Sequence, residues 1–329
     1  MESLDLRVLT DALVWRSNGH GVTLVTVVET WGSAPRPPGA MLAVRDDGVV
    51  SGSVSGGCVE DDLIARIKAG EHAGSKPSMI AYGVTKDEAA RFGLPCGGTL
   101  RLVQEPLLEM GWAKELLARA ANHELLARTL TLSTGAVQLR TAIRGEAMAF
   151  DGLTLTTMFG PKWRLLLIGA GQLSQAVAQI AQMLDFEVLV CDPREEYAAT
   201  LRMENVIRVQ GMPDDVVREM GADAHTAIVA LTHDSKLDDM ALMEALKSDA
   251  FYVGALGSRR NQATRKARLI EHFEMKEADF AKLHGPVGLR LGAKTPAEIA
   301  VSIMAEIVQI KNTAVNDSVS LPSQEDCRL

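Results

Sequence analysis

Two cysteines in this sequence stand beside pairs of glycines, where a thiol can bind a soft metal or act as a nucleophile. Cys58 follows Gly56-Gly57, and Cys96 precedes Gly97-Gly98. Glycine pairs leave space for a ligand beside the sulfur and expose backbone N–H groups. If the two loops converge, they form a pocket with two soft donors and several free N–H groups, which suits a metal that prefers sulfur.

The elements around Cys58 predict that it begins a helix. Residues 49–53 form the second strand of a predicted hairpin at Asp47-Gly48, and a helix with Leu63 and Ile67 on its buried face follows. The positive end of a helix dipole stabilises a thiolate at such a position. The alternative interpretation is that Cys58 is a small apolar residue that fills the junction of strand and helix.

A stiff loop carries the cation Arg36. The segment WGSAPRPPGAM, residues 31–41, follows a β-branched strand at 22–29. Prolines on both sides of Arg36 exclude regular structure, so the loop holds the guanidinium in a fixed place. Because a guanidinium fork suits phosphates and carboxylates, Arg36 is either a clamp for such an anion or a surface charge on a connector.

A second region whose residues could bind a ligand is 164–192. The apolar run at 164–168 is broken by Gly169-Ala170-Gly171, helical spacing follows, and another apolar run ends at Asp192. This is the pattern of a dinucleotide-binding βαβ unit, with an acid roughly twenty residues beyond the glycines. The turn suits a phosphate, and Asp192 can accept hydrogen bonds from a ribose.

One residue of this pattern is unusual. Ser174 stands at the third position of the fingerprint, where glycine is common. A serine is small enough for close packing of helix on strand, but it weakens the nicotinamide interpretation. The alternative is a Rossmann-like domain in which the glycines only make a turn and Asp192 only caps the next element.

Two later strands end in polar residues at the same expected edge. The strand at 227–231 ends at Thr232-His233-Asp234, and the strand at 251–255 leads to Gly257-Ser258-Arg259-Arg260. Because parallel strands share one carboxyl edge, we expect these residues to face a crevice together with Gly169, Gly171, Gln172 and Asp192. Glycines, a helix N-terminus and two arginines suit a phosphorylated ligand. His233 is either a structural residue at a strand tip or a group that points into this crevice.

The pattern of elements predicts an α/β protein with two domains. We expect an N-terminal α/β domain at 1–160, a Rossmann-like domain with a parallel sheet at 161–312, and a polar, flexible tail at 313–329. A helix is expected at 107–128 and short strands at 129–159. The capping box Thr295-Pro296-Ala297-Glu298 predicts a helix from 296 to about 311. Arg265, Lys266 and Arg268, on the helix after Arg260, are expected to form a solvated face.

Composition excludes several classes of protein. The chain has 329 residues, 47% hydrophobic and 23% charged, with a net charge of −8, which disfavours nucleic acid and anionic membrane surfaces as partners. The N-terminus lacks the features of a signal peptide, and no apolar run is long enough for a membrane span, so we expect a cytoplasmic protein. Four scattered cysteines predict reduced thiols rather than a disulfide framework.

Several segments together resemble one known family. The succession GSAPRPPGAM, SGGCVED, PCGG and GAG, with YVGALGSRR at 252–260 and GPVGLRLGAKTPAEIAVSIMAEIV at 285–308, is similar to the XdhC/CoxI family of accessory proteins for xanthine dehydrogenase and related molybdenum hydroxylases. The resemblance covers nearly the whole chain. One departure is Gln172, which follows the GAG turn where the family commonly has histidine.

The resemblance implies a carrier rather than an enzyme. Similar proteins bind the molybdenum cofactor, shield it while its terminal sulfur is installed with a cysteine desulfurase, and deliver it to the hydroxylase; a homodimer is expected by analogy. We therefore interpret Gly169, Gly171, Ser258 and Arg259 as phosphate-binding residues and Asp192 as orienting a polar group. Cys58 or Cys96 would contact or protect molybdenum, or relay sulfur.

Two other functions remain open at this stage. An NAD(P)-dependent oxidoreductase would account for the glycine fingerprint and Asp192, although no convincing catalytic acid–base pair accompanies them. A regulatory or scaffolding module that docks on a hydroxylase without carrying the cofactor is the third interpretation.

Overall fold

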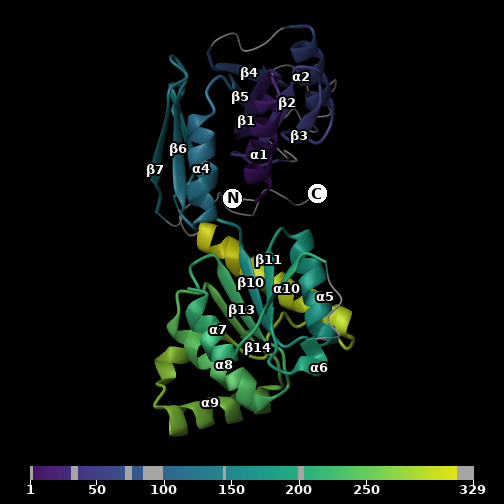
Figure 1. The fold of residues 1–329 in the computed structure, drawn as a ribbon, viewed down its shortest axis with the longest axis vertical. Helices are drawn as coiled ribbons and strands as arrows, with labels where there is room; N and C mark the ends of the chain where they lie inside the picture. The colour runs from purple at the N-terminus through teal and green to yellow at the C-terminus, as the bar shows by residue number, and fades with distance from the viewer. Residues whose placement is uncertain are drawn as a thin grey trace, which may run out of the picture. The chain divides into compact units, whose positions relative to one another are not determined.

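The computed structural model divides the chain into two compact units, Met1–Pro161 and Lys162–Leu329. Each unit has its own sheets and helices (Figure 1). The structure describes residues 3–30, 36–70, 76–83, 99–143, 146–198 and 204–316.

The N-terminal unit is built on a five-stranded antiparallel sheet in the order β3-β2-β1-β5-β4. Its strands are β1 (Val22–Thr30), β2 (Met41–Arg45), β3 (Val50–Gly52), β4 (Ser78–Tyr82) and β5 (Leu100–Pro106). Helix α1 (Ser3–Ser17) packs with Leu24 and Met41, and α2 (Cys58–Lys68) packs with Val25 and Leu42. Since neighbouring residues of a strand point to opposite faces, the two helices cover both faces of the sheet. This explains why β1 is apolar and buried along most of its length.

A smaller antiparallel sheet completes this unit in the order β7-β6-β9-β8. Its elements are β6 (Leu126–Thr131), β7 (Val137–Thr141), β8 (Ala149–Phe150) and β9 (Thr154–Phe159), with helix α4 (Gly111–Ala121) packed beside them. The expected helix at 107–128 was too long at both ends. The N–H of Leu107 still donates to the carbonyl of Val22, in continuation of the sheet, and His123 adopts a left-handed backbone (φ 62°) after the helix ends.

The C-terminal unit is a six-stranded parallel sheet, as the sequence predicted, in the order β12-β11-β10-β13-β14-β15. The strands are β10 (Arg164–Ile168), β11 (Glu187–Cys191), β12 (Val206–Val209), β13 (Thr226–Ala230), β14 (Tyr252–Ala255) and β15 (Leu283–His284). From β10 the chain adds β11 and β12 on one side of the sheet, and then returns to add β13, β14 and β15 on the other side. The order of the strands therefore reverses at β10, between β11 and β13. Ligands of open α/β sheets bind at such a switch point.

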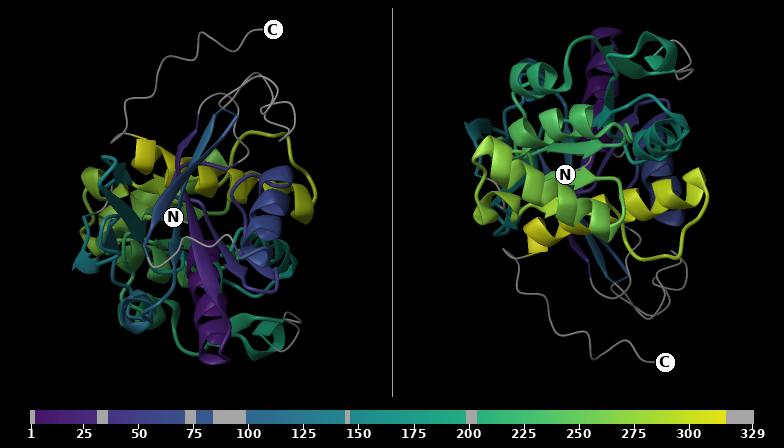
Figure 2. Two further views of the ribbon diagram at one scale, coloured as in Figure 1. Left: turned by 90° about the horizontal axis from the view of Figure 1, so that it is seen from above. Right: turned by 90° about the horizontal axis from the view of Figure 1, so that it is seen from below.

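Helices cover both faces of the parallel sheet (Figure 2). They are α5 (Gln172–Met183), α6 (Glu195–Ala198), α7 (Pro213–Glu219), α8 (Ser235–Lys247), α9 (Arg259–Phe273), the 3₁₀ helix η2 (Glu277–Phe280) and α10 (Pro296–Asn316). Helices α5 and α10 share one apolar core, and α7, α8 and α9 share the core on the opposite face. None of the helices in the described ranges combines the length and apolarity needed to cross a membrane.

The capping box at the start of α10 confirms the helix that the sequence predicted there. The Glu298 carboxylate accepts hydrogen bonds from the N–H groups of Lys294 and Thr295, and the Thr295 hydroxyl accepts one from the N–H of Glu298. Ile303 and Ile307 are buried against α5. The helix continues to Asn316, past the expected end near 311, and the remainder of the predicted tail, 317–329, lies outside the described residues.

Candidate functional site

A pocket of about 260 Å³ lies at the carboxyl edge of the parallel sheet, between the turns that follow β13 and β14. It brings together His233, Gly257 and Arg260, three of the residues predicted to face a common crevice. His233 is exposed at the pocket, with a left-handed backbone (φ 62°). We call this pocket and the neighbouring turn at Gly169–Gly171 the crevice.

The start of α9 gives the crevice its positive character. Ser258 is the N-cap, and its hydroxyl accepts a hydrogen bond from the N–H of Asn261 at 3.2 Å. Arg259 and Arg260 follow, both exposed, and the first turn carries no acidic residue. The helix dipole and two guanidinium groups therefore act together on an anion at this end.

Gly257 is required by the geometry of this turn. Its φ of +141° is rarely adopted by residues with a side chain, and a Cβ there would lie 3.2 Å from the Nε2 atom of Gln262. Gln262 donates from that atom to the carbonyls of Ala255 and Leu256, which are the last residues before the turn. The glycine thus allows the chain to pass close to α9 on its way into the helix.

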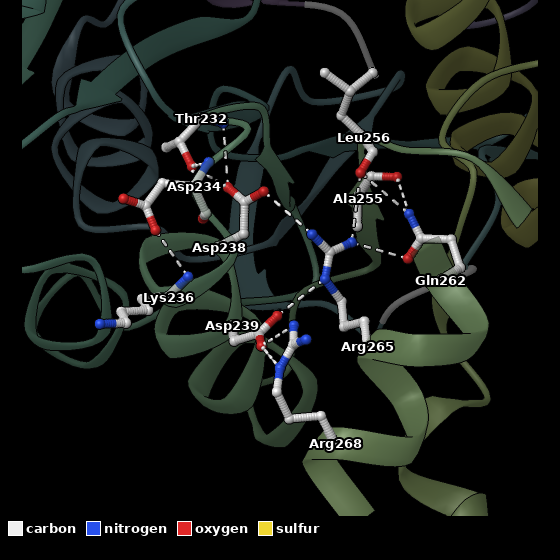
Figure 3. A network of polar contacts seen from close by, with 10 residues as sticks. All are labelled: Thr232, Asp234, Lys236, Asp238, Asp239, Ala255, Leu256, Gln262, Arg265 and Arg268. Carbon is white, nitrogen blue, oxygen red and sulfur yellow. Dashed lines mark hydrogen bonds and ion pairs between the residues drawn. The ribbon is translucent and has the colours of Figure 1, made fainter. Parts of the chain in front are cut away.

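A buried ion-pair network forms the wall behind the pocket (Figure 3). The Arg265 guanidinium on α9 reaches Asp239 at 2.9 Å and Asp238 at 3.2 Å, both on α8. Arg268 contacts Asp239 as well. The expected solvated face was therefore wrong for Arg265, which is buried, and for Arg268, which is half-buried. Lys266, the third member, pairs with Glu277.

Asp238 connects this network to the other wall of the pocket. Its carboxylate accepts hydrogen bonds from the N–H and the hydroxyl of Thr232, at 3.1 and 2.7 Å. Burial raises the pKa of Asp238, and the hydrogen bonds from Thr232 only partly oppose that rise. The turns after β13 and β14 are thus tied together through buried groups, which holds the crevice open before any ligand binds. Sequence reasoning missed Asp238 and Asp239, although two acids inside an apolar helix were a signal.

The glycine turn after β10 lies at the same edge. Gly169 has φ +110°, and a Cβ there would come within 3.2 Å of Thr232, so a side chain at this position would be strained and would crowd Thr232. Gly171 precedes α5 without a side-chain cap, and Gln172, the first residue of α5, is exposed. Ser174 is buried, and its hydroxyl has no hydrogen-bond partner among the residues that the structure describes.

Asp192 is already engaged by the protein. Its side chain is 0% exposed, and it accepts hydrogen bonds from the N–H of Ala170 and from both the backbone and the guanidinium of Arg194. Burial alone would raise the pKa of Asp192, but these hydrogen bonds outweigh it and lower the pKa. A ribose hydroxyl would have to compete with Arg194 for this carboxylate, so its predicted contact with a ligand stays a prediction. Arg194, which sequence reasoning missed, adds a cation beside the glycine turn.

Cys58 begins α2 and is exposed, as the sequence predicted for the start of this helix. The loop before it is organised by Glu60, in the first turn of the same helix. The Glu60 carboxylate accepts hydrogen bonds at 2.8–2.9 Å from the N–H groups of Val54, Ser55, Gly56 and Gly57, and others from the hydroxyls of Ser53 and Ser55. Burial by itself would raise the pKa of Glu60, but the Ser55 hydroxyl and the backbone of the turn lower that pKa to about 2. We expected free N–H groups beside Cys58, and this was wrong for the N–H groups of residues 54–57, which donate to Glu60.

The second thiol loop lies beyond the part of the chain that the structure describes. It contains Cys96, Gly97 and Gly98, so their convergence with Cys58 stays a prediction. Arg36 is half-buried at the edge of a described range, and its role as an anion clamp likewise stays a prediction.

Within the described ranges, no three side chains of His, Cys, Asp or Glu gather to hold a metal ion. Burial raises the pKa of the Cys191 thiol to about 12, with a further contribution from Asp192, which disfavours the reactive thiolate.

Comparisons with known proteins match both units. Residues 15–83 fit the family model described as the XdhC and CoxI family, and residues 165–307 fit the XdhC Rossmann domain. A Bacillus subtilis protein, named as a probable subunit of xanthine dehydrogenase, is 29% identical, over 92% of this chain and 96% of its own. The Escherichia coli molybdenum cofactor insertion chaperone PaoD is 30% identical, over 97% of this chain and 91% of its own.

A solved structure shares the whole fold. It is a Bacillus halodurans protein described as a xanthine dehydrogenase, with a TM-score of 0.75 and 23% identity, covering 95% of this chain and 96% of the other. At that identity the likeness concerns the fold alone. It shows that the arrangement of strands and helices described above occurs in a known protein.

Proposed function

This chain belongs to the XdhC and CoxI family, and on that premise we propose that it is an accessory protein that binds the molybdenum cofactor and inserts it into xanthine dehydrogenase or a related hydroxylase. The name of its Escherichia coli relative, a molybdenum cofactor insertion chaperone, supports the role. So does the name of its Bacillus subtilis relative, which points to xanthine dehydrogenase as the client. The chain acts as a carrier and turns over no free substrate.

The observation that carries this proposal is the positive, preformed crevice at the carboxyl edge of the parallel sheet. Molybdopterin bears a phosphate, and the crevice offers Arg259, Arg260 and the uncapped start of α5 to such a group. The buried wall around Arg265 fixes these donors in place, which lowers the entropic cost of binding. An acidic protein that keeps cations at one sheet edge is suited to an anionic cargo.

The proposal gives the predicted site residues the following individual roles. Gly169 and Gly171 let the backbone approach the phosphate, Ser258 and Arg259 bind it from α9, and Arg260 and His233 complete the rim. Asp192 orients Arg194, which becomes a further cation for the cargo. Exposed Cys58 protects molybdenum or relays sulfur, together with Cys96.

The finer parts of the role rest on the family resemblance. The carrier shields the cofactor while a cysteine desulfurase supplies its terminal sulfur, works in the cytoplasm, and forms a homodimer. Replacing Cys58 and Cys96 by serine tests the thiol role: the double variant should retain cofactor but deliver it less completely sulfurated. Unchanged hydroxylase activity after delivery would remove the thiols from this account.

The central experiment is anaerobic purification of the protein from cells that make the cofactor, followed by assay of molybdenum and of oxidised pterin fluorescence. We expect near-stoichiometric amounts of both, and neither from cells that cannot make the cofactor. An empty protein that binds NAD(P) would favour an oxidoreductase instead. An empty protein that binds the hydroxylase tightly would favour a scaffolding module.

A further inference from the structure

A second pocket is lined by none of the residues predicted to bind the cofactor. It measures about 570 Å³ and lies within the N-terminal unit, where the end of β5, the start of α4 and strand β7 meet. We call it the Arg128 groove. Its lining runs from Pro77 to Leu139, and nearly all of it falls between the two stretches matched by family models, 15–83 and 165–307.

The groove contains a buried ion pair with unsatisfied atoms. Arg128 on β6 is 1% exposed and Glu105 on β5 is 7% exposed, and a single hydrogen bond of 2.5 Å joins them. The second carboxylate oxygen of Glu105 and the Nε atom of Arg128 are buried without a partner among the described residues. Trp112 covers one face of the guanidinium at 4.1 Å. A buried ion pair with unpaired polar atoms is destabilising. A binding partner that brings a hydrogen-bond donor to Glu105 and an acceptor to Arg128 would remove this cost.

The walls and rim of the groove define what would bind. Apolar side chains of Leu107, Leu108, Val137 and Leu139 line it, and Leu108 is 58% exposed. Glu109 and Glu115 add exposed carboxylates. With Glu105 they make three carboxylates in the lining against the one guanidinium of Arg128. Glu115 also pairs with Arg119 at 3.4 Å on its own helix, so the acidic character of the groove comes mainly from Glu105 and Glu109, beside the apolar walls. An anionic cofactor is disfavoured here, and a basic, partly aliphatic occupant is favoured.

We propose that the Arg128 groove is the docking site for the client hydroxylase, and that it takes an extended segment presenting a lysine or arginine between aliphatic side chains. The basic side chain donates to the free oxygen of Glu105, and a backbone carbonyl of the segment accepts from the Nε–H of Arg128. The aliphatic groups pack on Leu108 and Leu139. Strand β7, at the edge of its sheet, offers unpaired backbone groups beside the groove. This inference rests on the proposed carrier function for the identity of the partner.

The test measures binding between the full-length protein, purified from cofactor-making cells, and the host's xanthine dehydrogenase-type hydroxylase purified without cofactor. The variant Glu109→Lys/Glu115→Lys reverses the rim charge, and Leu108→Asp adds a charge to the apolar wall. All three side chains are exposed, so folding should be unaffected, as thermal unfolding would verify. We expect each variant to bind the hydroxylase roughly tenfold more weakly or worse, and the double variant to lose much of the salt dependence.

A matched control carries the same charge change elsewhere. Glu219→Lys/Glu271→Lys alters two exposed glutamates on α7 and α9, outside the groove, and should leave the affinity within about twofold. If the groove variants bind like the wild type, or if wild type does not bind the hydroxylase at all, the docking proposal is wrong. The same holds if the control weakens binding equally, because the effect would then reflect net charge alone.

Two further readouts separate this proposal from the carrier function. Every variant should retain the molybdenum and pterin of the wild type, since the groove is not the cofactor site; an empty wild type would overturn the carrier role while its docking could still be measured. A photo-crosslinker in place of Leu108 should attach to a hydroxylase segment that contains a lysine or arginine. Attachment to this chain itself, or to a segment without a basic residue, would contradict the proposed occupant.

Discussion

Two turns of this protein look alike in sequence but differ in what occupies them. Gly56-Gly57 leads into α2, and Gly169-Ala170-Gly171 leads into α5. At the first turn the Glu60 carboxylate fills the nest of backbone N–H groups, so the protein supplies its own anion. At the second turn the N–H of Gly169 donates to the carbonyl of Cys191 and the N–H of Ala170 to Asp192, and α5 begins without an acidic residue or a side-chain cap.

An acidic residue in the first helical turn distinguishes a structural glycine turn from one that can bind a ligand. An acid three residues into the helix can fold back onto the turn and satisfy it, as Glu60 does. Where the first turn lacks an acid, as in α5 and α9, fewer N–H groups are taken: α5 has no side-chain cap, and in α9 the Ser258 hydroxyl accepts only from the N–H of Asn261. The comparison thus favours the C-terminal crevice as the proposed anion site and gives the Glu60 turn a structural role.

The largest effect should come from breaking the crevice wall. Arg265→Met leaves Asp238 without its buried partner and removes one of the two arginines that contact Asp239, so we expect a loss of about 3–5 kcal/mol in the free energy of unfolding. Denaturant unfolding measures it. The neighbouring variant Lys266→Met, whose side chain is half-exposed, should cost less than about 1 kcal/mol. Equal effects of the two would show that the buried network does not hold the crevice.

Removing the internal anion of the N-terminal turn should have the next largest effect. Glu60→Ala leaves four backbone N–H groups without their acceptor, and we expect a loss of about 2–3 kcal/mol, because water reaches part of the loop. Asp61→Ala, at the exposed next position, is the control. Hydrogen exchange of residues 53–68 would localise the change to this turn.

The Glu60→Ala variant also tests which of the two turns holds the cofactor. Cofactor content should stay at the wild-type level in Glu60→Ala, provided the protein remains folded at the assay temperature. A variant of unchanged stability that loses its molybdenum would reverse the assignment and place the cargo at the N-terminal turn.

A smaller effect is expected from a single cation of the crevice. Arg260→Ala removes one charge-assisted contact to the phosphate, so retention of molybdenum and pterin should weaken roughly tenfold. Arg218→Ala, which removes an exposed arginine of α7 paired only at the surface, should change nothing measurable. Retention that is equal in both variants would exclude Arg260 from the cargo site.

The last prediction concerns pH. The pKa of Glu60 falls from 4.5 to about 2 in the fold, so its stabilising contribution is complete above pH 4.5 and is lost as the pH falls from there toward about 2. The difference in stability between wild type and Glu60→Gln should therefore narrow over that interval and stay constant above it. A difference that is independent of pH would mean that the carboxylate is not held as an anion in the turn.

The sequence located most elements because their signals are local. Apolar periodicity, the Asp47-Gly48 hairpin and the Thr295–Glu298 capping box depend on residues a few positions apart, and the structure confirms the elements at each. The parallel sheet followed from alternating strands and helices, and with it the meeting of His233, Gly257 and Arg260 at one edge. The helix expected at 107–128 was wrong at its ends, because apolar periodicity alone does not show where packing returns the chain to a sheet.

The tertiary structure is needed to tell which charged side chains are buried in ion pairs and which are exposed to a ligand. Arg265 looked like a surface residue because its partners, Asp238 and Asp239, are 27 and 26 residues away on another helix. The pairing of Arg128 with Glu105 joins two different sheets in the same way. The strength of an ion pair depends on distance and on exclusion of water, and both are set by how helices and sheets pack. Local patterns in the sequence therefore fixed most of the elements and the sheet edge at which we propose that a ligand binds, whereas packing fixed which charged groups at that edge are already paired within the protein.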